Sequence, residues 1–165
     1  VPRGSDVLDL GCGTGFHVTG RLASEYRVVG VDLSPRSISI AKTRAPETTF
    51  IVGDIASVAF ADESFDAVIA FLSLIHVPRE LHAEVLTNIA SWLRPGGWFI
   101  GTMGAESREG TFGDFLGVDM YWSSWGAATN VELVRDVGLV ETATEETEDE
   151  DGKLVTHLWV VAQRP

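Results

Sequence analysis

The sequence predicts a single α/β domain, doubly wound around a mostly parallel sheet, and three observations support this prediction. Apolar runs of four to seven residues alternate with segments of helical periodicity over roughly the first hundred residues. That alternation is typical of βαβ units, whose strands lie parallel. The last two apolar runs have no helix between them, so they should pair antiparallel. The chain of 165 residues is 45% hydrophobic, which is enough for one core.

The first half of the chain alternates three predicted strands with two helices. A short apolar run ends where the glycines begin at Gly11, which predicts a buried strand entering a tight turn. Ser34 and Pro35 are typical of an N-cap and a first helical position, so a helix should begin there. The predicted order is strand 7–10, helix 16–24, strand 27–31, helix 35–44 and strand 49–52.

The second half is predicted to hold a long helix, an insertion and a final pair of strands. Apolar residues at helical spacing indicate a helix over 79–93, ended by Arg94-Pro95-Gly96-Gly97. Glycines and aromatic residues over 104–127 indicate an irregular insertion on the substrate side. The other predicted elements are strands 65–71 and 98–103, helix 130–137 ended by Gly138, and strands 139–144 and 154–162 around an acidic hairpin tip at 145–151.

Charge and composition exclude several classes of partner. Acidic residues outnumber basic ones 24 to 12, and six of the acids lie within 144–151, so the rest of the domain is acidic as well. DNA or RNA would be repelled by such a surface, which predicts no nucleic-acid partner. The longest apolar run, 67–75, is far short of the roughly 20 residues of a membrane helix, so no membrane partner is expected. The single cysteine, Cys12, permits no intrachain disulfide, and together with the lack of a visible signal peptide this favours a cytoplasmic location.

The strongest local motif is a glycine turn formed by Gly11, Gly13 and Gly15 between a strand and a helix. Glycine lets the main chain turn sharply and lets a ligand approach it, and the following helix N-terminus favours a carboxylate. A dinucleotide fingerprint would need glycine where Phe16 stands, and the lysine of a phosphate-binding loop is absent. The turn therefore favours a nucleoside ligand with less phosphate than NAD or ATP.

Acidic residues stand at the ends of successive predicted strands, where they could meet such a nucleoside. Asp32 lies 21 residues after Gly11, a position from which a carboxylate accepts ribose hydroxyls. Asp54 could accept from an adenine amino group, with Ile55 against the ring. Asp9 lies inside a strand, where an unpaired carboxylate is costly, so it should hold the loop amides or a ligand amino group.

At this point the sequence resembles the class I S-adenosylmethionine-dependent methyltransferases, and in particular the small stand-alone members that act on small molecules. The resemblance extends from Val7 to about Ala162. It is carried by Val-Leu-Asp-Leu-Gly-Cys-Gly-Thr-Gly (7–15), Val-Asp-Leu-Ser (31–34), Gly-Asp-Ile (53–55), Ser-Phe-Asp-Ala-Val (64–68) and Leu-Arg-Pro-Gly-Gly (93–97).

The resemblance implies a Rossmann-like, seven-stranded sheet of order 3-2-1-4-5-7-6 with strand 7 antiparallel, and S-adenosylmethionine as the cofactor. The residues implied to bind the cofactor are Asp9, Gly11, Cys12, Gly13, Gly15, Asp32, Leu33, Asp54, Ile55, Phe71 and Leu72. Family members usually carry one or two helices before the first strand, and we expect these to be missing here. The first residues, Val1 to Ser5, fit either a native turn or the remnant of a tag-cleavage site.

Candidate catalytic residues follow from the chemistry that the resemblance implies. A sulfonium methyl group is already a strong electrophile, so a base is needed only if the acceptor arrives protonated. His76 follows the fourth predicted strand and could be that base, a pocket wall or a structural residue. Tyr121, in an aromatic cluster at 120–125, could donate a hydrogen bond to the substrate or belong to a small core under a loop.

The other histidines are weaker candidates for a functional role. His17 could contact the cofactor, His82 is expected on an exposed helix surface, and His157 on a sheet face. The four histidines lack metal-ligand spacing, so no metal site is predicted.

The sequence therefore predicts methyl transfer to oxygen, nitrogen or carbon of a small molecule. The alternatives are a non-catalytic module that binds S-adenosylmethionine or S-adenosylhomocysteine, and a protein methyltransferase. Methylation of adenine amino groups is disfavoured, because Phe71-Leu72-Ser73-Leu74 stands where an Asn/Asp-Pro-Pro-Tyr/Phe motif would lie. The acceptor and the oligomeric state stay open.

Overall fold

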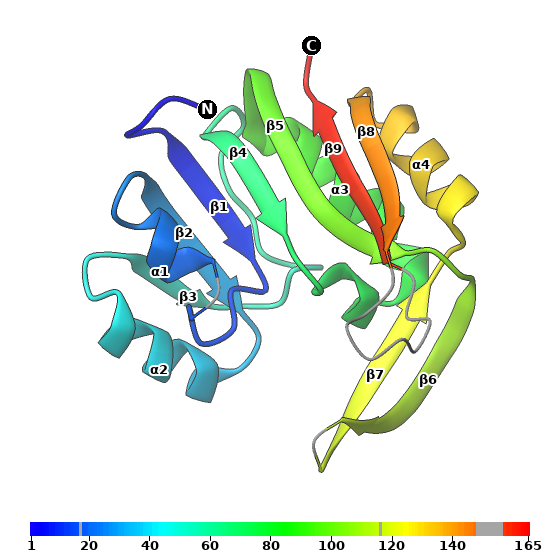
Figure 1. The fold of residues 1–165 in the computed structure, drawn as a ribbon, viewed down its shortest axis with the longest axis horizontal. Helices are drawn as coiled ribbons and strands as arrows, with labels where there is room; N and C mark the ends of the chain where they lie inside the picture. The colour runs from blue at the N-terminus through cyan, green and yellow to red at the C-terminus, as the bar shows by residue number, and fades with distance from the viewer. Residues whose placement is uncertain (17, 116, 148–156) are drawn as a thin grey trace.

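A seven-stranded sheet of order β3-β2-β1-β4-β5-β9-β8 organises the chain in the computed structural model, which describes residues 1–16, 18–115, 117–147 and 157–165 (Figure 1). The strands are β1 (Asp6–Leu10), β2 (Arg27–Asp32), β3 (Thr49–Val52), β4 (Phe65–Ala70), β5 (Leu93–Gly104), β8 (Val140–Thr147) and β9 (His157–Gln163). Strands β1 to β5 pair in parallel, and β9 runs antiparallel to both β5 and β8. The predicted strand order and the antiparallel last strand are confirmed.

Helices lie at both ends of this sheet. The α-helices are α1 (Thr19–Leu22), α2 (Pro35–Arg44), α3 (His82–Trp92) and α4 (Ala127–Asp136), and two 3-10 turns are η1 (Leu74–His76) and η2 (Arg79–Leu81). Figure 1 shows α1 and α2 beside β2 and β3, and α3 and α4 behind the half formed by β5, β9 and β8. Ser34 caps α2 by accepting a hydrogen bond from Ser37 N at 3.2 Å, with Pro35 in the first turn, as the sequence predicts.

The main core fills the space between the sheet and α3. Leu86 and Ile89 on α3 are fully buried, as are Leu8, Val68 and Phe99 on the strands that they cover. Burying each such side chain contributes about 1.5–3 kcal/mol. This packing fixes the carboxyl ends of β1 and β4 relative to η1 and η2, the turns that precede α3.

The segment 104–127 was expected to be irregular, and the structure corrects this. It contains an antiparallel hairpin of β6 (Arg108–Phe115) and β7 (Val118–Ser124), which extends beyond the lower edge of the sheet in Figure 1. One glycine that suggested a loop has another purpose. A Cβ at Gly110 would overlap the Tyr121 hydroxyl, whereas a Cβ at Gly113 would make only an ordinary contact, 3.9 Å from Trp122 Nε1. Gly110 therefore gives the Tyr121 ring room across the hairpin.

Several predicted boundaries also shift. The first helix is shorter than 16–24, α4 begins three residues before residue 130, and the predicted helix over 79–93 divides into η2 and α3. Strand β8 continues through 145–147, which were expected to form a loop tip. The remaining acidic residues, 148–151, and His17 lie outside the described residues.

Candidate functional site

The glycine loop leaves β1 and is tied to the end of β2. Gly11 N and Cys12 N both donate to Val31 O, at 2.8 and 3.0 Å. Gly11, Gly13 and Gly15 all have positive φ, between 55° and 81°. A Cβ at Gly11 would overlap Ser73 Cβ, so the loop packs directly against the segment that follows β4. Both the left-handed backbone and this close approach therefore require glycine at position 11.

Asp32 holds the loop in place. One carboxylate oxygen accepts from Gly13 N at 2.9 Å and the other from Ser34 N at 2.9 Å. Each oxygen of a carboxylate can accept a further bond, and the side chain is only partly buried. Asp32 therefore stands beside the glycine loop with acceptor capacity left over for a ligand.

Asp9 has a different partner from the loop amides that the sequence suggested. It is 3% exposed and accepts a hydrogen bond from Thr19 Oγ1 at 2.5 Å, at the start of α1. Burial raises the pKa of Asp9 to about 6; the Thr19 bond opposes this shift and the nearby charge of Asp32 adds to it. Cys12 is half-buried, and burial together with these two carboxylates raises the pKa of its thiol to about 12. The thiol is therefore protonated at neutral pH and is no nucleophile.

Exposed apolar side chains surround the loop at this edge of the sheet. Leu33 follows β2 and is 70% exposed, and Leu72 follows β4 and is 52% exposed. Leu72 has a φ of 54°, and its N–H donates to Thr102 Oγ1 at 2.5 Å, which holds a strained backbone in place. Such exposure beside a carboxylate is typical of a surface that a partly apolar ligand covers.

The remaining residues predicted for the cofactor are spread around this edge. Asp54 is exposed, and one of its carboxylate oxygens accepts a hydrogen bond from Ala56 N at 2.9 Å. Ile55 is half-buried against the main core. Phe71 is half-buried, with its ring 5.4 Å from that of Trp159.

His76 lies at the end of η1, one short turn after Ser73. Its Nδ1 is 2.7 Å from Tyr121 O, and its ring centroid is 4.4 Å from that of Trp122. A carbonyl oxygen can only accept, so Nδ1 carries the hydrogen and Nε2 keeps its lone pair in the neutral ring. A 3-10 turn rises by about 2 Å per residue, so His76 stays close to the glycine loop that Ser73 contacts.

The structure brings the backbone of Tyr121 to His76, and the Tyr121 ring lies elsewhere. That ring packs on Phe112, with centroids 5.3 Å apart, on the hairpin face opposite to Trp122. Neighbouring residues of a strand point to opposite faces, so the ring that lies against His76 is that of Trp122 rather than that of Tyr121. The sequence indicates an aromatic cluster at 120–125, but only the pairing register of the hairpin shows that Tyr121 and Trp122 lie on opposite faces.

His82 was expected on an exposed surface, and the structure shows it 2% exposed. Its Nε2 lies 3.0 Å from both Leu74 O and Val77 O, so it donates to carbonyls at the two ends of η1. Burial lowers the pKa of His82, so the ring is neutral at neutral pH. The signal was present in the sequence, because His82 precedes the buried Val85, Leu86 and Ile89 by three, four and seven residues.

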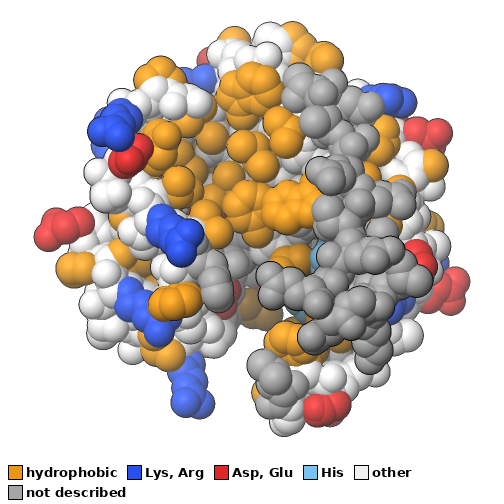
Figure 2. Space-filling model, in the orientation of Figure 1, with side chains coloured by type: hydrophobic (Ala, Val, Ile, Leu, Met, Phe, Trp, Pro, Cys, Tyr) orange, Lys and Arg blue, Asp and Glu red, His pale blue; other side chains and the backbone are white. Residues whose placement is uncertain are grey.

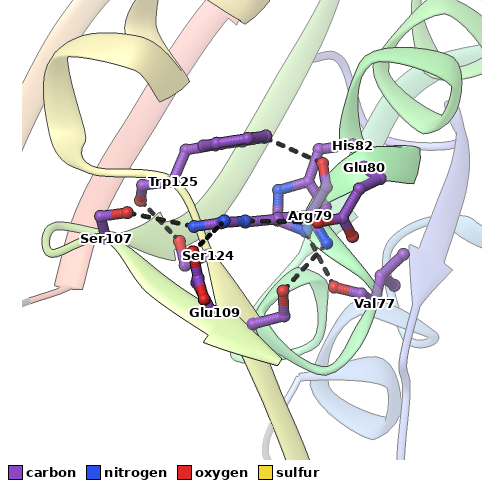
Figure 3. Close-up of polar contacts among 9 residues, drawn as sticks. Val77, Arg79, Glu80, His82, Ser107, Glu109, Ser124 and Trp125 are labelled. Atoms are coloured by element: carbon purple, nitrogen blue, oxygen red, sulfur yellow. Dashed lines mark hydrogen bonds and ion pairs between the residues drawn. The ribbon is translucent and has the colours of Figure 1, made fainter. Parts of the chain in front are cut away.

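Arg79 joins η2 to the hairpin, and sequence reasoning missed it. Figure 3 shows its guanidinium stacked over Trp125, 4.2 Å from the ring centroid, and bonded to Ser107 Oγ at 3.3 Å and Glu109 Oε1 at 3.2 Å. Trp125 Nε1 in turn donates to Arg79 O at 2.9 Å. The contacts of Arg79 with the hairpin lie on one side of η1, and the hydrogen bonds of His82 to Leu74 O and Val77 O hold η1 itself.

The described residues hold neither a cluster of metal-binding side chains nor a helix that could span a membrane. They contain no group of three or more histidine, cysteine or acidic side chains that could hold a metal ion. In the same residues, no helix has the length and apolar character that crossing a lipid bilayer requires.

Comparison with known proteins places this geometry in a family. The family model described as a methyltransferase domain matches residues 7–97. The chain is 38% identical over 101 residues to O-methyltransferase rstn1 of Aspergillus nomiae, covering 57% of this chain and 44% of that protein. It is 32% identical over 142 residues to 27-O-demethylrifamycin SV methyltransferase of Amycolatopsis mediterranei, covering 82% of this chain and 46% of that protein. The chain thus spans less than half the length of these curated relatives.

A solved structure has the same fold over nearly the whole chain. The crystal structure of a SAM-dependent methyltransferase from Methanosarcina mazei superposes with a TM-score of 0.84 at 19% identity, covering 99% of this chain and 94% of that chain. At that identity the likeness concerns the fold alone. The family assignment comes from the family model, which covers more than half of the chain, including the glycine loop and the strand ends around it. The chain therefore belongs to the class I S-adenosylmethionine-dependent methyltransferases.

Proposed function

We propose that this chain transfers a methyl group from S-adenosylmethionine to an oxygen, nitrogen or carbon atom of a small molecule. One observation carries the proposal: the left-handed glycine loop, the Asp32 carboxylate and the exposed Leu33 and Leu72 meet at one edge of the sheet. The names of both curated relatives described above specify oxygen, which makes oxygen the favoured acceptor atom.

The residues around the glycine loop fit S-adenosylmethionine. The spare acceptor capacity of Asp32 suits two ribose hydroxyls, and the exposed Leu33 suits a face of the adenine ring. The acidic pair Asp9 and Asp32 favours a ligand that carries positive charge near the loop. When bound, the cofactor supplies a methyl group on a positively charged sulfur, which needs no further activation.

The part that remains for the protein is to place the acceptor and take up its proton. We assign the proton to His76 Nε2, because Nδ1 is held by Tyr121 O and Nε2 is the nitrogen with a lone pair. Imidazole is the side chain that most often takes up a proton in enzymes that work near neutral pH. The walls of the site, including Trp122, would exclude water from the acceptor.

The cofactor assignment is tested by isothermal titration calorimetry with S-adenosylhomocysteine and, separately, with NAD. We expect micromolar binding of S-adenosylhomocysteine and none of NAD. Asp32→Ala should weaken binding by about 1–3 kcal/mol, the cost of removing a partner from hydrogen-bonding groups. Glu132→Gln, an exposed acidic residue on α4, is the matched control and should bind as the wild type does. A folded protein that binds NAD equally well, or neither ligand, would refute the assignment.

The alternatives of a non-catalytic binding module and a protein methyltransferase are separated by label transfer. The protein would be incubated with methyl-tritiated S-adenosylmethionine and either a panel of small hydroxylated compounds or a protein extract. Label in small molecules supports the proposal, and label only in protein bands supports a protein substrate. Tight cofactor binding with no transfer to either pool supports the binding module. His76→Ala should keep S-adenosylhomocysteine binding and lose transfer to hydroxyl groups.

A further inference from the structure

The hairpin of β6 and β7 has two faces of different chemistry. In the pairing register Phe112 lies opposite Tyr121, and Asp114 opposite Asp119, so these four side chains share one face. The other face carries Thr111, Gly113, Phe115, Val118, Met120 and Trp122, none of which is charged. We refer to Phe115, Val118, Met120 and Trp122 as the apolar face.

The apolar face is organised around one indole ring. Trp122 Nε1 lies 3.9 Å from where a Cβ of Gly113 would be, so the ring lies beside Gly113 on the same face. The Trp122 ring reaches Phe115 at a centroid distance of 5.9 Å and His76 at 4.4 Å. Phe115 is 46% exposed and Val118 is 61% exposed, so much of this face is open to a ligand. Three rings thus lie in series, and the last of them is the proposed base.

This face borders the region where an acceptor must lie. His76 is joined to the glycine loop through η1 and Ser73, which touches Gly11. Figure 2 shows the molecule hollowed at its lower edge, between the side that carries α2 and the side that carries the hairpin, with some hydrophobic side chains beside the hollow. The guanidinium of Arg79 is already engaged by Trp125, Ser107 and Glu109. The apolar face itself therefore offers an acceptor aromatic and aliphatic surface, with the His76 ring against Trp122.

We propose that the apolar face and His76 bind a planar aromatic methyl acceptor that is uncharged apart from an ionisable hydroxyl group. The aromatic body packs on Phe115 and Trp122, and the hydroxyl group hydrogen-bonds to His76 Nε2. Offset or edge-to-face ring pairs favour an aromatic body over a saturated one of equal size. This inference rests on the proposed function, because it names the substrate class of that same site.

The test compares two ligands and two phenylalanines. The ligands are 2-naphthol and decahydro-2-naphthol, which share a carbon skeleton but differ in planarity, aromaticity and acidity of the hydroxyl group, so the comparison of the two variants isolates what the Phe115 ring contributes. The variants are Phe115→Leu, on the apolar face, and Phe112→Leu, on the opposite face of the same hairpin. Both phenylalanines are exposed, so neither change should unfold the protein, which a thermal melt would verify. Binding is measured by calorimetry with the protein saturated in S-adenosylhomocysteine.

We expect 2-naphthol to bind at least fivefold more tightly than its saturated analogue. Phe115→Leu should reduce this preference about threefold to tenfold, as loss of one aromatic pair does. Phe112→Leu should leave it unchanged. Equal binding of the two ligands, or equal effects of the two variants, would overturn the inference while S-adenosylhomocysteine binding leaves the proposed function intact. A dimer in sedimentation velocity that Phe115→Leu dissociates would also overturn it, because the face would then join two copies of the chain.

Discussion

Replacing His82 with glutamine tests whether a buried neutral imidazole holds the turn that carries His76. His82 is 2% exposed, and its Nε2–H is shared between Leu74 O and Val77 O at 3.0 Å each. A glutamine amide can reach at most part of this arrangement, so at least one buried carbonyl would lose its donor. Such a loss costs about 1–3 kcal/mol of unfolding free energy. We expect His82→Gln to be destabilised by that amount at pH 7.5.

The same variant should also change how stability depends on pH. Burial lowers the pKa of folded His82 below the ordinary value of 6.5, so below pH 6.5 the unfolded chain binds a proton that the folded chain resists. The stability contributed by the neutral ring is therefore fully present above pH 6.5 and is lost as the pH falls. Between pH 7.5 and 5.5 the wild type should lose up to about 1.4 kcal/mol through this residue, at 1.36 kcal/mol per pH unit. The glutamine variant has no such proton to bind.

Urea unfolding of both proteins at pH 7.5 and 5.5 measures the two effects separately. The difference in stability between wild type and His82→Gln should shrink by up to about 1.4 kcal/mol on acidification. Glu84→Gln, an exposed residue in the first turn of the same helix, is the control: removing its charge should cost at most about 1 kcal/mol, and that cost should be the same at both pH values. A difference between wild type and His82→Gln that stays constant with pH would show that His82 is not a buried neutral group.

Three further predictions concern the glycine loop and the hairpin. Gly11→Ala should lower the free energy of unfolding by about 2–5 kcal/mol, because the new Cβ overlaps Ser73 and the backbone is left-handed. Gly13→Ala is left-handed too but has nothing within 4 Å, so urea unfolding should show a loss of only about 1–2 kcal/mol. Equal losses in the two variants would contradict the close approach of Gly11 to Ser73. Asp9 has a pKa of about 6 when folded, so the wild type is destabilised as pH rises, and Asp9→Asn should gain about 2 kcal/mol relative to it between pH 4.5 and 7.5; a constant difference would argue against a buried carboxylate. Arg79→Ala should lower the free energy of unfolding by about 1–3 kcal/mol and speed amide hydrogen exchange in β6 and β7, because it removes the contacts with Trp125, Ser107 and Glu109. Unchanged exchange there would mean that the hairpin does not depend on these contacts.

Strand order and the glycine loop could be predicted because their signals are local and agree with one another. The apolar run at Val7, the glycines that begin at Gly11 and the helix start at Ser34 each satisfy a short-range rule, and together they leave few topologies. The antiparallel last strand followed from a missing helix alone. These features depend on residues that are near one another in sequence.

The parts that sequence reasoning got wrong depend on contacts between distant residues. Gly110 looks like a loop residue until the Tyr121 hydroxyl is placed beside it. His82 looks like a polar surface residue until η1 turns two carbonyls toward it. Arg79 has no local signal, because its partners Ser107 and Trp125 are 28 and 46 residues away. Local periodicity does not report such partners.

The hydrogen bond from His76 Nδ1 ends on a main-chain carbonyl, that of Tyr121, and this separates two properties of the hairpin. Side chains at positions 115 and 118 can be exchanged for others without removing the oxygen that fixes the imidazole tautomer. Under the proposed function, substitutions at these positions would change the acceptor preference while the proposed base, His76, keeps its orientation. A library of substitutions at these two exposed positions would be a low-risk starting point for changing the proposed acceptor.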